Sequence, residues 1–236
     1  YFATIRLGAS TITDDKESDV LVRGDKQKIK ELSLPAIESA ISQFRGQIMQ
    51  IPSSVSAIKV DGERAYAKVR SGDEVKLAER SVEVTAFEIT HEIGIVHEGE
   101  NMYFDIEVQV DCSSGTYIRA LARDLGQSLG VGGHLTALRR SRIGKYTIDQ
   151  AQQLDGLSSE TLSVLDVSLA ARQQFETKAL SDQDVIDLRH GKRLKATGEG
   201  VKPFAGVDES GKLIAMLTVS GKDIKSLVVF NDGVDT

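Results

Sequence analysis

The stretch from Asn101 to Lys145 constrains the fold more than any other part of the chain, because two backbone periodicities follow each other within it. Polar and apolar residues alternate from Met102 to Asp111, which predicts a strand with one buried and one exposed face. From Ile118 to Leu129 apolar residues recur at helical spacing, and Gly130 would end that helix. A second strand is predicted from His134 to Ile143, after a glycine turn.

Positive charge gathers in the same stretch. One acid, Asp124, lies between Ser113 and Lys145, while the whole chain carries a formal net charge of −6. The basic residues there are Arg119, Arg123, Arg139, Arg140, Arg142 and Lys145. Such a local basic cluster on an acidic chain is typical of a site for a polyanion. Tyr117 and Arg119 add an aromatic face and a guanidinium beside the turn. Spacing alone leaves open an ordinary strand–helix–strand packing unit with solvated arginines.

Four segments together resemble a known family. CSSGTYIRALARDLG, followed by GVGGHLTALRR, resembles the active-site region of the TruB family of pseudouridine synthases. The relatives that work with guide RNAs share the GTYIR core. YFATIRLGASTITDD and FRGQIMQIPSSVSAIKVDGERAYAKVRSG resemble the bacterial branch, the tRNA pseudouridine(55) synthases. The resemblance runs from Tyr1 to about Leu154.

The resemblance implies a fold and a reaction. The expected fold class is α+β, with a mixed, mainly antiparallel sheet, flanking helices and a small β-rich, PUA-like C-terminal domain. The expected reaction detaches the base of a uridine in the T loop of tRNA and rejoins it through C5, with no cofactor or metal. The target base has to leave its stack first, which costs a few kcal/mol.

Four residues match positions of the family's catalytic site. The resemblance implies that Tyr117 stacks on the flipped base and that Arg119 orients the catalytic aspartate, whose pKa an arginine lowers. Tyr1 matches a second aromatic residue near the site. Leu138 matches an apolar wall of the pocket, although an ordinary core leucine is the alternative there.

The aspartate that acts as nucleophile in the family is not among the 236 residues. The family carries it in a GxLDxxAxG-like loop, and this chain has no such motif. Because Tyr1 already lies in a strand-like pattern, we expect a further segment to precede it. Asp14 and Asp15 occupy a polar stretch that reads as a solvated turn, so we predict no catalytic role for either.

The segment from Gln50 to Gly72 combines irregular backbone with positive charge, which suits contact with an RNA backbone. A charged surface hairpin is the alternative. By resemblance this region grips the T arm of tRNA, with Lys59 in a SAIK motif and a short helix from Glu63 to Ser71. The predicted RNA-binding residues are Lys59, Arg64, Lys68, Arg70, Arg123, Arg139 and Arg140.

The remaining patterns predict scaffold elements and three parts of the chain. A helix should begin at Ser33 and end at Gly46, and a strand should cover Ser81–Ile89, with His91 and His97 in an exposed turn after it. Near the C-terminus we expect a helix from Ser181 and three strands over 203–207, 212–219 and 225–230. The predicted parts are a catalytic domain (1–154), a linker (155–176) and an RNA-binding domain (177–236).

Composition limits the remaining possibilities. No apolar run has membrane-spanning length, and one cysteine with four scattered histidines gives no metal-binding motif. We therefore expect a cytoplasmic monomer that binds tRNA, without a membrane, a metal or an obligatory protein partner. Two alternatives stay open: a non-catalytic tRNA-binding or tRNA-folding module, and an RNA-guided relative.

Overall fold

The computed structural model describes residues 1–53, 59–60, 63–64, 78–196 and 202–230. The chain forms two compact units, Tyr1–Ser141 and Arg142–Thr236, and each is described by itself. The predicted limits of the domains, including the one at 154, stay a prediction.

The first unit is built on a five-stranded sheet with the order β4-β7-β8-β1-β9. All neighbouring strands in it are antiparallel. Its elements are β1 (Phe2–Leu7), β2 (Ala9–Thr11), β3 (Val20–Arg23), α1 (Lys26–Lys30), α2 (Leu34–Ser42), β4 (Gly46–Gln50), β5 (Lys59–Val60), β6 (Glu63–Arg64), β7 (Arg80–Glu98), β8 (Asn101–Cys112), α4 (Ile118–Ser128) and β9 (Gly133–Arg139). The α+β fold class, mainly antiparallel, is confirmed.

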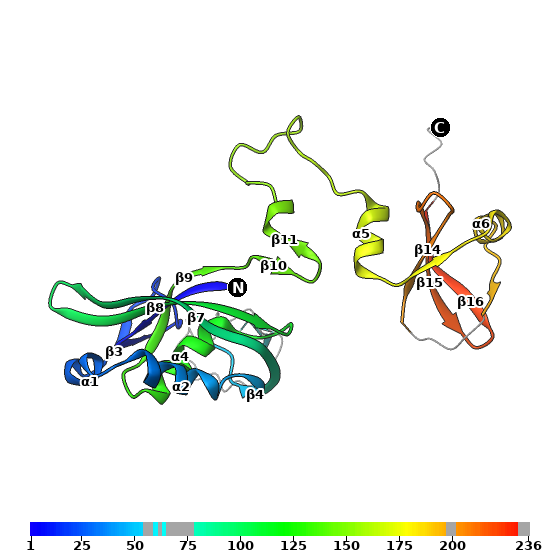
Figure 1. Cartoon of the computed structure of the whole chain (residues 1–236). Helices are drawn as coiled ribbons and strands as arrows, with labels where there is room; N and C mark the ends of the chain where they lie inside the picture. The colour runs from blue at the N-terminus through cyan, green and yellow to red at the C-terminus, as the bar shows by residue number, and fades with distance from the viewer. Residues whose placement is uncertain (54–58, 61–62, 65–77, 197–201, 231–236) are drawn as a thin grey trace. The chain divides into compact units, whose positions relative to one another are not determined.

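Helices cover one face of this sheet, as Figure 1 shows for α1, α2 and α4. The alternation predicted in β1 explains the layering, because Ala3, Ile5 and Leu7 are buried under the helices. On the other face of β1, Arg6 donates to both oxygens of buried Asp105 in β8 and stacks on Tyr103, 4.6 Å from the ring centroid. The core therefore lies between the sheet and α2 and α4.

The β7–β8 hairpin is longer than the sequence indicates. The strand predicted to stop at Ile89 continues to Glu98, and only Gly99 and Glu100 form the turn. The prediction of a long turn was wrong: His91 and His97 lie within β7, where both are exposed. From Glu88 to Glu98 neither face of β7 is buried. Polar and apolar residues therefore do not alternate clearly in this part, and the hydrophobic pattern did not indicate a strand.

Helix α4 and strand β9 approach each other through glycine. A Cβ placed on Gly126 would lie 2.1 Å from the backbone nitrogen of Gly133 and 2.2 Å from the carbonyl carbon of Gly132. The glycine turn predicted at 132–133 is therefore also a contact surface for α4. The second strand is shorter than predicted, because β9 ends at Arg139 and the short strand β10 (Arg142–Ile143) pairs instead with β11 (Tyr146–Thr147).

The predicted short helix from Glu63 begins differently. Glu63 and Arg64 form β6, which pairs with β5 in an antiparallel ladder. The start of the helix at Glu63 was therefore wrong, and the rest of that predicted helix lies outside the described residues. The start of the other predicted helix is confirmed, since α2 follows Ser33 and carries Pro35 in its first turn. Its predicted end at Gly46 was wrong, because α2 ends at Ser42 and Gly46 begins β4.

The second unit contains a smaller sheet with the order β12-β14-β15-β16-β13. The β12–β14 pair is parallel and the other pairs are antiparallel. Its elements after β11 are η1 (Ile148–Gln150), α5 (Val167–Gln174), β12 (Thr177–Ala179), α6 (Asp182–Arg189), β13 (Leu194–Lys195), β14 (Phe204–Val207), β15 (Leu213–Ser220) and β16 (Asp223–Val229). The predicted small β-rich C-terminal domain is confirmed, and Ser181 caps α6 through a reciprocal bond pair with Asp184.

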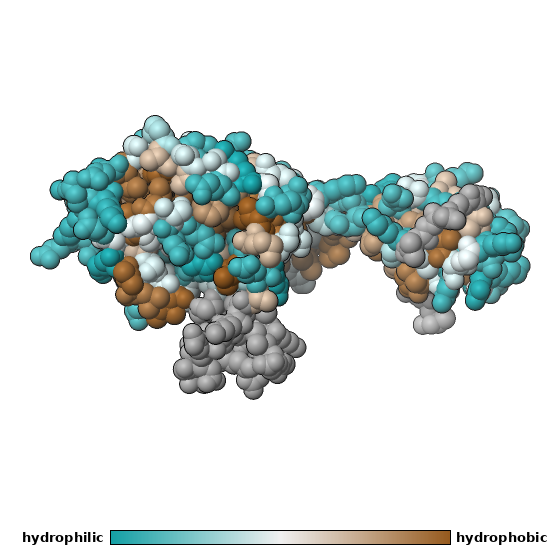
Figure 2. Space-filling model, turned by 90° about the horizontal axis from the view of Figure 1, so that it is seen from below, coloured by the Kyte–Doolittle hydropathy of each residue, from teal (hydrophilic) through white to brown (hydrophobic). Residues whose placement is uncertain are grey.

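Figure 2 shows hydrophilic colours over much of one face, interrupted by separate apolar areas. Within the described part of the chain, no helix is both long and apolar enough to cross a membrane.

Candidate active site

The N-terminus of α4 presents the residues singled out in the sequence. Tyr117 occupies the N-cap position with extended backbone angles (φ −103°, ψ 106°). Arg119 and Arg123 follow one turn apart on the half-exposed side of the helix, while Ile118, Leu121 and Leu125 fill the core. The helix thus sets an aromatic residue and two guanidiniums along one edge, as its periodicity predicts.

The loop after β2 lies against β9 and is not a solvated turn. Asp14 is only 5% exposed, and its backbone is left-handed (φ 57°), a conformation that aspartate tolerates better than most residues. The carbonyl of Asp14 accepts from the Leu135 amide at 3.0 Å, and the Lys16 amide donates to the Leu135 carbonyl at 2.8 Å. The predicted solvated turn was therefore wrong, because long-range backbone bonds hold this loop on the sheet.

Both aspartates of this loop face the arginines of α4. Asp15 Oδ2 lies 3.2 Å from Arg119 Nε, and Asp14 Oδ2 lies 3.3 Å from Arg123 Nη1. Burial raises the pKa of Asp14, and the positive charge of Arg123 opposes that shift. Two consecutive acids and two arginines one turn apart thus form paired contacts between the loop and the helix.

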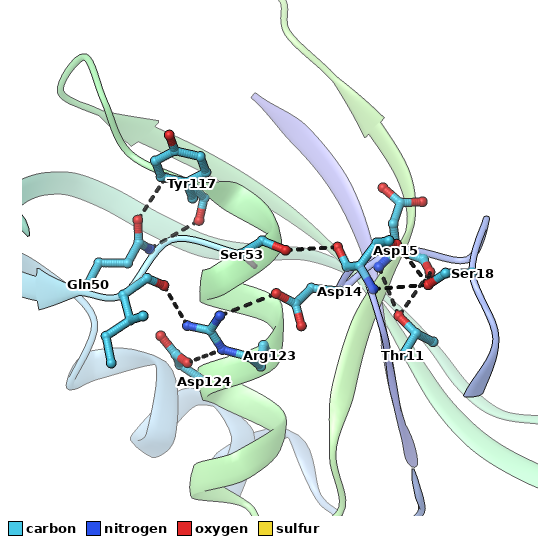
Figure 3. A network of polar contacts seen from close by, with 11 residues as sticks. Thr11, Asp14, Asp15, Ser18, Gln50, Ser53, Tyr117, Arg123 and Asp124 are labelled. Carbon is cyan, nitrogen blue, oxygen red and sulfur yellow. Dashed lines mark hydrogen bonds and ion pairs between the residues drawn. The ribbon is translucent and has the colours of Figure 1, made fainter. Parts of the chain in front are cut away.

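Arg123 makes further contacts inside the protein. Its Nε lies 2.8 Å from Asp124 Oδ1, and its Nη2 donates to the carbonyl of Ile51 at 2.8 Å (Figure 3). With the contact to Asp14, each nitrogen of the Arg123 guanidinium therefore has an acceptor within the protein. The role of Arg123 in RNA binding stays a prediction.

Gln50, at the end of β4, was missed by reasoning from the sequence. Its amide contacts the backbone of Tyr117 twice, and Ser53 donates to the carbonyl of Thr13 at 3.2 Å (Figure 3). Gln50 and Ser53 are each 1% exposed. The available signal was a polar residue at the inward end of a strand, directly before an irregular segment.

Tyr1 and Leu138 lie at one end of the sheet. Tyr1 is partly buried against the core and exchanges two backbone bonds with Val110 of β8. Leu138 is the register partner of Ala3 in β1, and it is 43% exposed. Arg139 and Arg140 follow at the exposed end of β9. An apolar side chain and two arginines, consecutive in the sequence, therefore lie at the edge of the sheet.

The remaining predicted RNA-binding residues lie in or near the insertion. Lys59 and Arg64 are register partners in the β5–β6 pair, whereas Lys68 and Arg70 fall outside the described residues. Among the residues with described positions, no three histidine, cysteine or acidic side chains are grouped to hold a metal ion.

Comparison with known proteins identifies the family. The model of the TruB family pseudouridylate synthase N-terminal domain matches residues 1–118. A tRNA pseudouridylate synthase B C-terminal domain matches 119–178, and a tRNA pseudouridine synthase II C-terminal model matches 175–231. The chain belongs to the TruB family. The resemblance predicted from the sequence is confirmed.

Curated TruB proteins resemble the chain over nearly all of its length. It is 47% identical to the tRNA pseudouridine synthase B of Paenarthrobacter aurescens over 241 residues, which covers 99% of this chain and 75% of that protein. It is 46% identical to the Leifsonia xyli protein of the same name, covering 98% of this chain and 75% of that protein. As a TruB-family chain it belongs to the pseudouridylate synthases, which are enzymes.

Solved structures share the fold at low sequence identity. The chain in a structure of an H/ACA RNP bound to a substrate RNA containing 2'-deoxyuridine is 18% identical, with a TM-score of 0.56. A chain of a Cbf5-Nop10-Gar1 complex is 19% identical, with a TM-score of 0.54. The TruB chain is covered to 98% in both comparisons, but it spans 65% and 67% of those chains.

Proposed function

We propose that the protein is a tRNA pseudouridine synthase that converts the T-loop uridine to pseudouridine without a cofactor. The observation that carries the proposal is the edge of α4, where Tyr117 lies two residues from an arginine already paired with a carboxylate. Relatives named tRNA pseudouridine synthase B match nearly the whole chain and support tRNA as the substrate.

Tyr117 would act as the platform for the flipped base. Removing a uracil from its stack costs a few kcal/mol, and stacking on an aromatic ring returns about 1–3 kcal/mol per base. Tyr117 is half-buried and heads a helix whose core side is packed, so its backbone is held while its ring stays accessible. Tyr1 and Leu138 would add an aromatic and an apolar surface that limit water at the reacting base.

Arg119 would orient the carboxylate that attacks the ribose. Its guanidinium offers several donors, and its pairing with Asp15 uses Nε, which leaves the terminal nitrogens for a second carboxylate. Asp15 is then a positioning residue that fixes the orientation of the guanidinium. The nucleophile in this proposal is the aspartate that the family resemblance implies, which is not in these 236 residues.

The basic residues of β9 and of the insertion would contact RNA phosphates. Arg139 and Arg140 are exposed, and contacts to phosphate give affinity and register without reading sequence. Lys59, Arg64, Lys68, Arg70 and Arg123 complete the proposed set.

Tritium release from an unmodified tRNA transcript labelled at uracil C5 tests the proposal, because the C5 hydrogen leaves when the new bond forms. This chain alone is compared with a chimera that joins it to the N-terminal segment of the Paenarthrobacter aurescens relative. We expect release by the chimera and none by the chain alone. No release by a folded, tRNA-binding chimera would contradict the proposed reaction, and release by the chain alone would assign the nucleophile to an internal carboxylate.

A further inference from the structure

The side chain of Gln50 is buried and pairs with both polar groups of one distant peptide backbone. Its Nε2 donates to the carbonyl of Tyr117 at 3.0 Å, and its Oε1 accepts from the amide of Tyr117 at 2.8 Å. Gln50 is the last residue of β4, and it lies 67 positions before Tyr117 in the sequence. The Gln50 side chain thus makes the two hydrogen bonds to the Tyr117 backbone that a neighbouring strand makes within a sheet.

The backbone of Tyr117 needs such a partner. As the N-cap residue of α4 it has extended angles, and its side chain makes no capping bond. Its carbonyl also accepts from the Leu121 amide at 3.2 Å, which is a bond of the helix itself. A primary amide supplies one donor and one acceptor side by side, which suits an N–H and a C=O of one residue. Without Gln50 the carbonyl would keep its bond from Leu121, whereas the Tyr117 amide would lose the acceptor described above. Leaving a buried amide unpaired costs about 1–3 kcal/mol.

The residues after Gln50 are fixed to the same surroundings. Arg123 donates to the carbonyl of Ile51, and Ser53 donates to the carbonyl of Thr13, next to Asp14 (Figure 3). Residues 50–53 therefore contact the start of α4, its second turn and the aspartate loop. This strap, defined as residues 50–53, touches both the helix and the loop that carry the paired arginines and aspartates.

We propose that Gln50 is a positioning residue for Tyr117: it fixes the backbone from which the ring projects, and so sets the position of the flipped base. The proposal rests on the proposed function, since it concerns the same tyrosine. A misplacement of about 1 Å at a reacting group lowers rates by roughly a hundredfold. Loss of Gln50 should accordingly reduce turnover while leaving affinity for tRNA, which depends mainly on phosphate contacts, nearly unchanged.

Two variants separate this role from simple packing. Gln50→Leu keeps a similar volume and removes both hydrogen bonds. Gln50→Glu keeps the shape, and its carboxyl can donate to the Tyr117 carbonyl only when protonated. Gln47→Leu is the matched control, because Gln47 is an exposed residue of the same strand.

The charged surroundings determine how Gln50→Glu titrates. Arg80 is the register partner of Gln50 in β7, and Arg123 lies beside the next carbonyl with Asp14 and Asp124. Burial favours the protonated carboxyl, whereas the arginines favour the ionised one. The rate of Gln50→Glu relative to the parent should therefore fall as the pH rises, by about tenfold once the carboxylate forms. The relative rate of Gln50→Leu should be low at every pH.

The parent protein in this experiment is the chimera that tests the proposed function. Three quantities are measured in it and its variants: single-turnover tritium release, the Kd for tRNA, and hydrogen exchange at the Tyr117 amide. We expect Gln50→Leu to release tritium about ten to a hundred times more slowly, with a Kd within threefold of the parent and faster exchange at Tyr117. Gln47→Leu should match the parent in all three.

The outcomes distinguish the two proposals. Faster exchange at Tyr117 with an unchanged rate would overturn the positioning role and leave the proposed function intact. A Gln50→Leu variant equal to the parent in both rate and exchange would also overturn it, because shape alone would then suffice. An inactive parent would instead contradict the proposed function, while the exchange measurement would still report on the Gln50–Tyr117 contact.

Discussion

At the scale of single residues, the pair Arg119–Asp15 gives the most direct test of the candidate active site. The Arg119 side chain is 41% exposed, so the pair contributes little to folding stability. We expect Arg119→Ala in the chimera to lower turnover by at least a hundredfold and to leave tRNA affinity within a few-fold. Single-turnover kinetics and equilibrium binding measure the two effects separately.

Asp15→Asn supplies the comparison for Arg119→Ala. It keeps the side-chain shape and removes the charge that holds the guanidinium, so a smaller loss of turnover is expected. The double variant should be no slower than Arg119→Ala, because both changes act through one guanidinium. Additive losses would show that Asp15 acts independently of Arg119.

His134 predicts a pH dependence of stability. Its Nδ1 lies 3.0 Å from the carbonyl of Ala9, and burial lowers the pKa of the imidazole. Below its ordinary pKa of about 6.5 the unfolded chain binds a proton that the folded chain does not, so stability falls as the pH falls through that value. The slope contributed is at most about 1.4 kcal/mol per pH unit.

His134→Asn tests this, since asparagine can still donate to Ala9 but does not titrate. We expect the variant to be less stable than the parent at pH 8, because it fills less volume. Between pH 6.5 and 5 the gap between the two should narrow in urea unfolding experiments. A constant gap would contradict the assignment.

Residue-level predictions from the sequence succeeded where the neighbours in the chain decide the environment. Tyr117 and Arg119 lie at the start of a helix as their spacing indicates. The prediction that Asp14 is solvated was wrong, and the contact of Gln50 with Tyr117 was missed. Both failures have one physical reason, because each residue is buried against a partner more than 60 positions away in the sequence. Local polarity gives no information on such pairings.

At the scale of elements, the contact of α4 with the 132–133 turn depends on the absence of a side chain. Alanine in place of Gly126 would gain about 1 kcal/mol in helix propensity. Its Cβ would lie within 2.1–2.4 Å of three backbone atoms, which cannot move as a flexible side chain can. Overpacking of this kind costs about 1–3 kcal/mol or more.

We therefore expect Gly126→Ala to destabilise the protein by about 2 kcal/mol, measured as a lower midpoint in urea. Gln127→Ala, at an exposed position of the same helix, is the control and should change stability by less than about 0.5 kcal/mol. An increase in stability for Gly126→Ala would mean that the turn shifts readily away from the helix.

Strong alternation and helical spacing predicted most elements to within a few residues, including α2, α4, α6, β8 and three strands of the second unit, β14, β15 and β16. The extension of β7 past Ile89 was not predictable in this way. Backbone pairing with β8 holds that part of the strand, and its side chains are mostly exposed, so burial left no pattern in the sequence.

At the scale of the whole molecule, the chain has an excess of negative charge, but one stretch of it carries an excess of positive charge. The chain is acidic, yet Arg139 and Arg140 lie exposed at the end of β9, within the basic stretch from Ser113 to Lys145. If these two arginines contact phosphates, Arg139→Gln with Arg140→Gln should weaken tRNA binding at low salt. The slope of log K against log salt should become shallower by about one for each phosphate that the variant no longer neutralises.

Lys26→Gln with Lys30→Gln gives the matched control. It removes the same charge from exposed positions of α1, so it has the same effect on net charge. Binding titrations at several salt concentrations should show an unchanged slope for this variant. Equal changes in both double variants would show that net charge, not position, governs affinity.

The long β7 strand also affects how copies of this protein meet one another. β4 pairs with β7 only over Arg80–Val84, and Arg45 donates to the Phe87 carbonyl beyond it. Within the described residues, the outer edge of β7 from Glu88 to Glu98 carries no further strand, and Ile93 and Ile95 are exposed on it. Two register shifts, at Ile89/His91 and at Glu92/Gly94, distort this edge, and it carries three glutamates. Both features oppose the addition of a strand from another molecule. The hairpin that completes the sheet therefore also carries the features that oppose edge-to-edge pairing between copies.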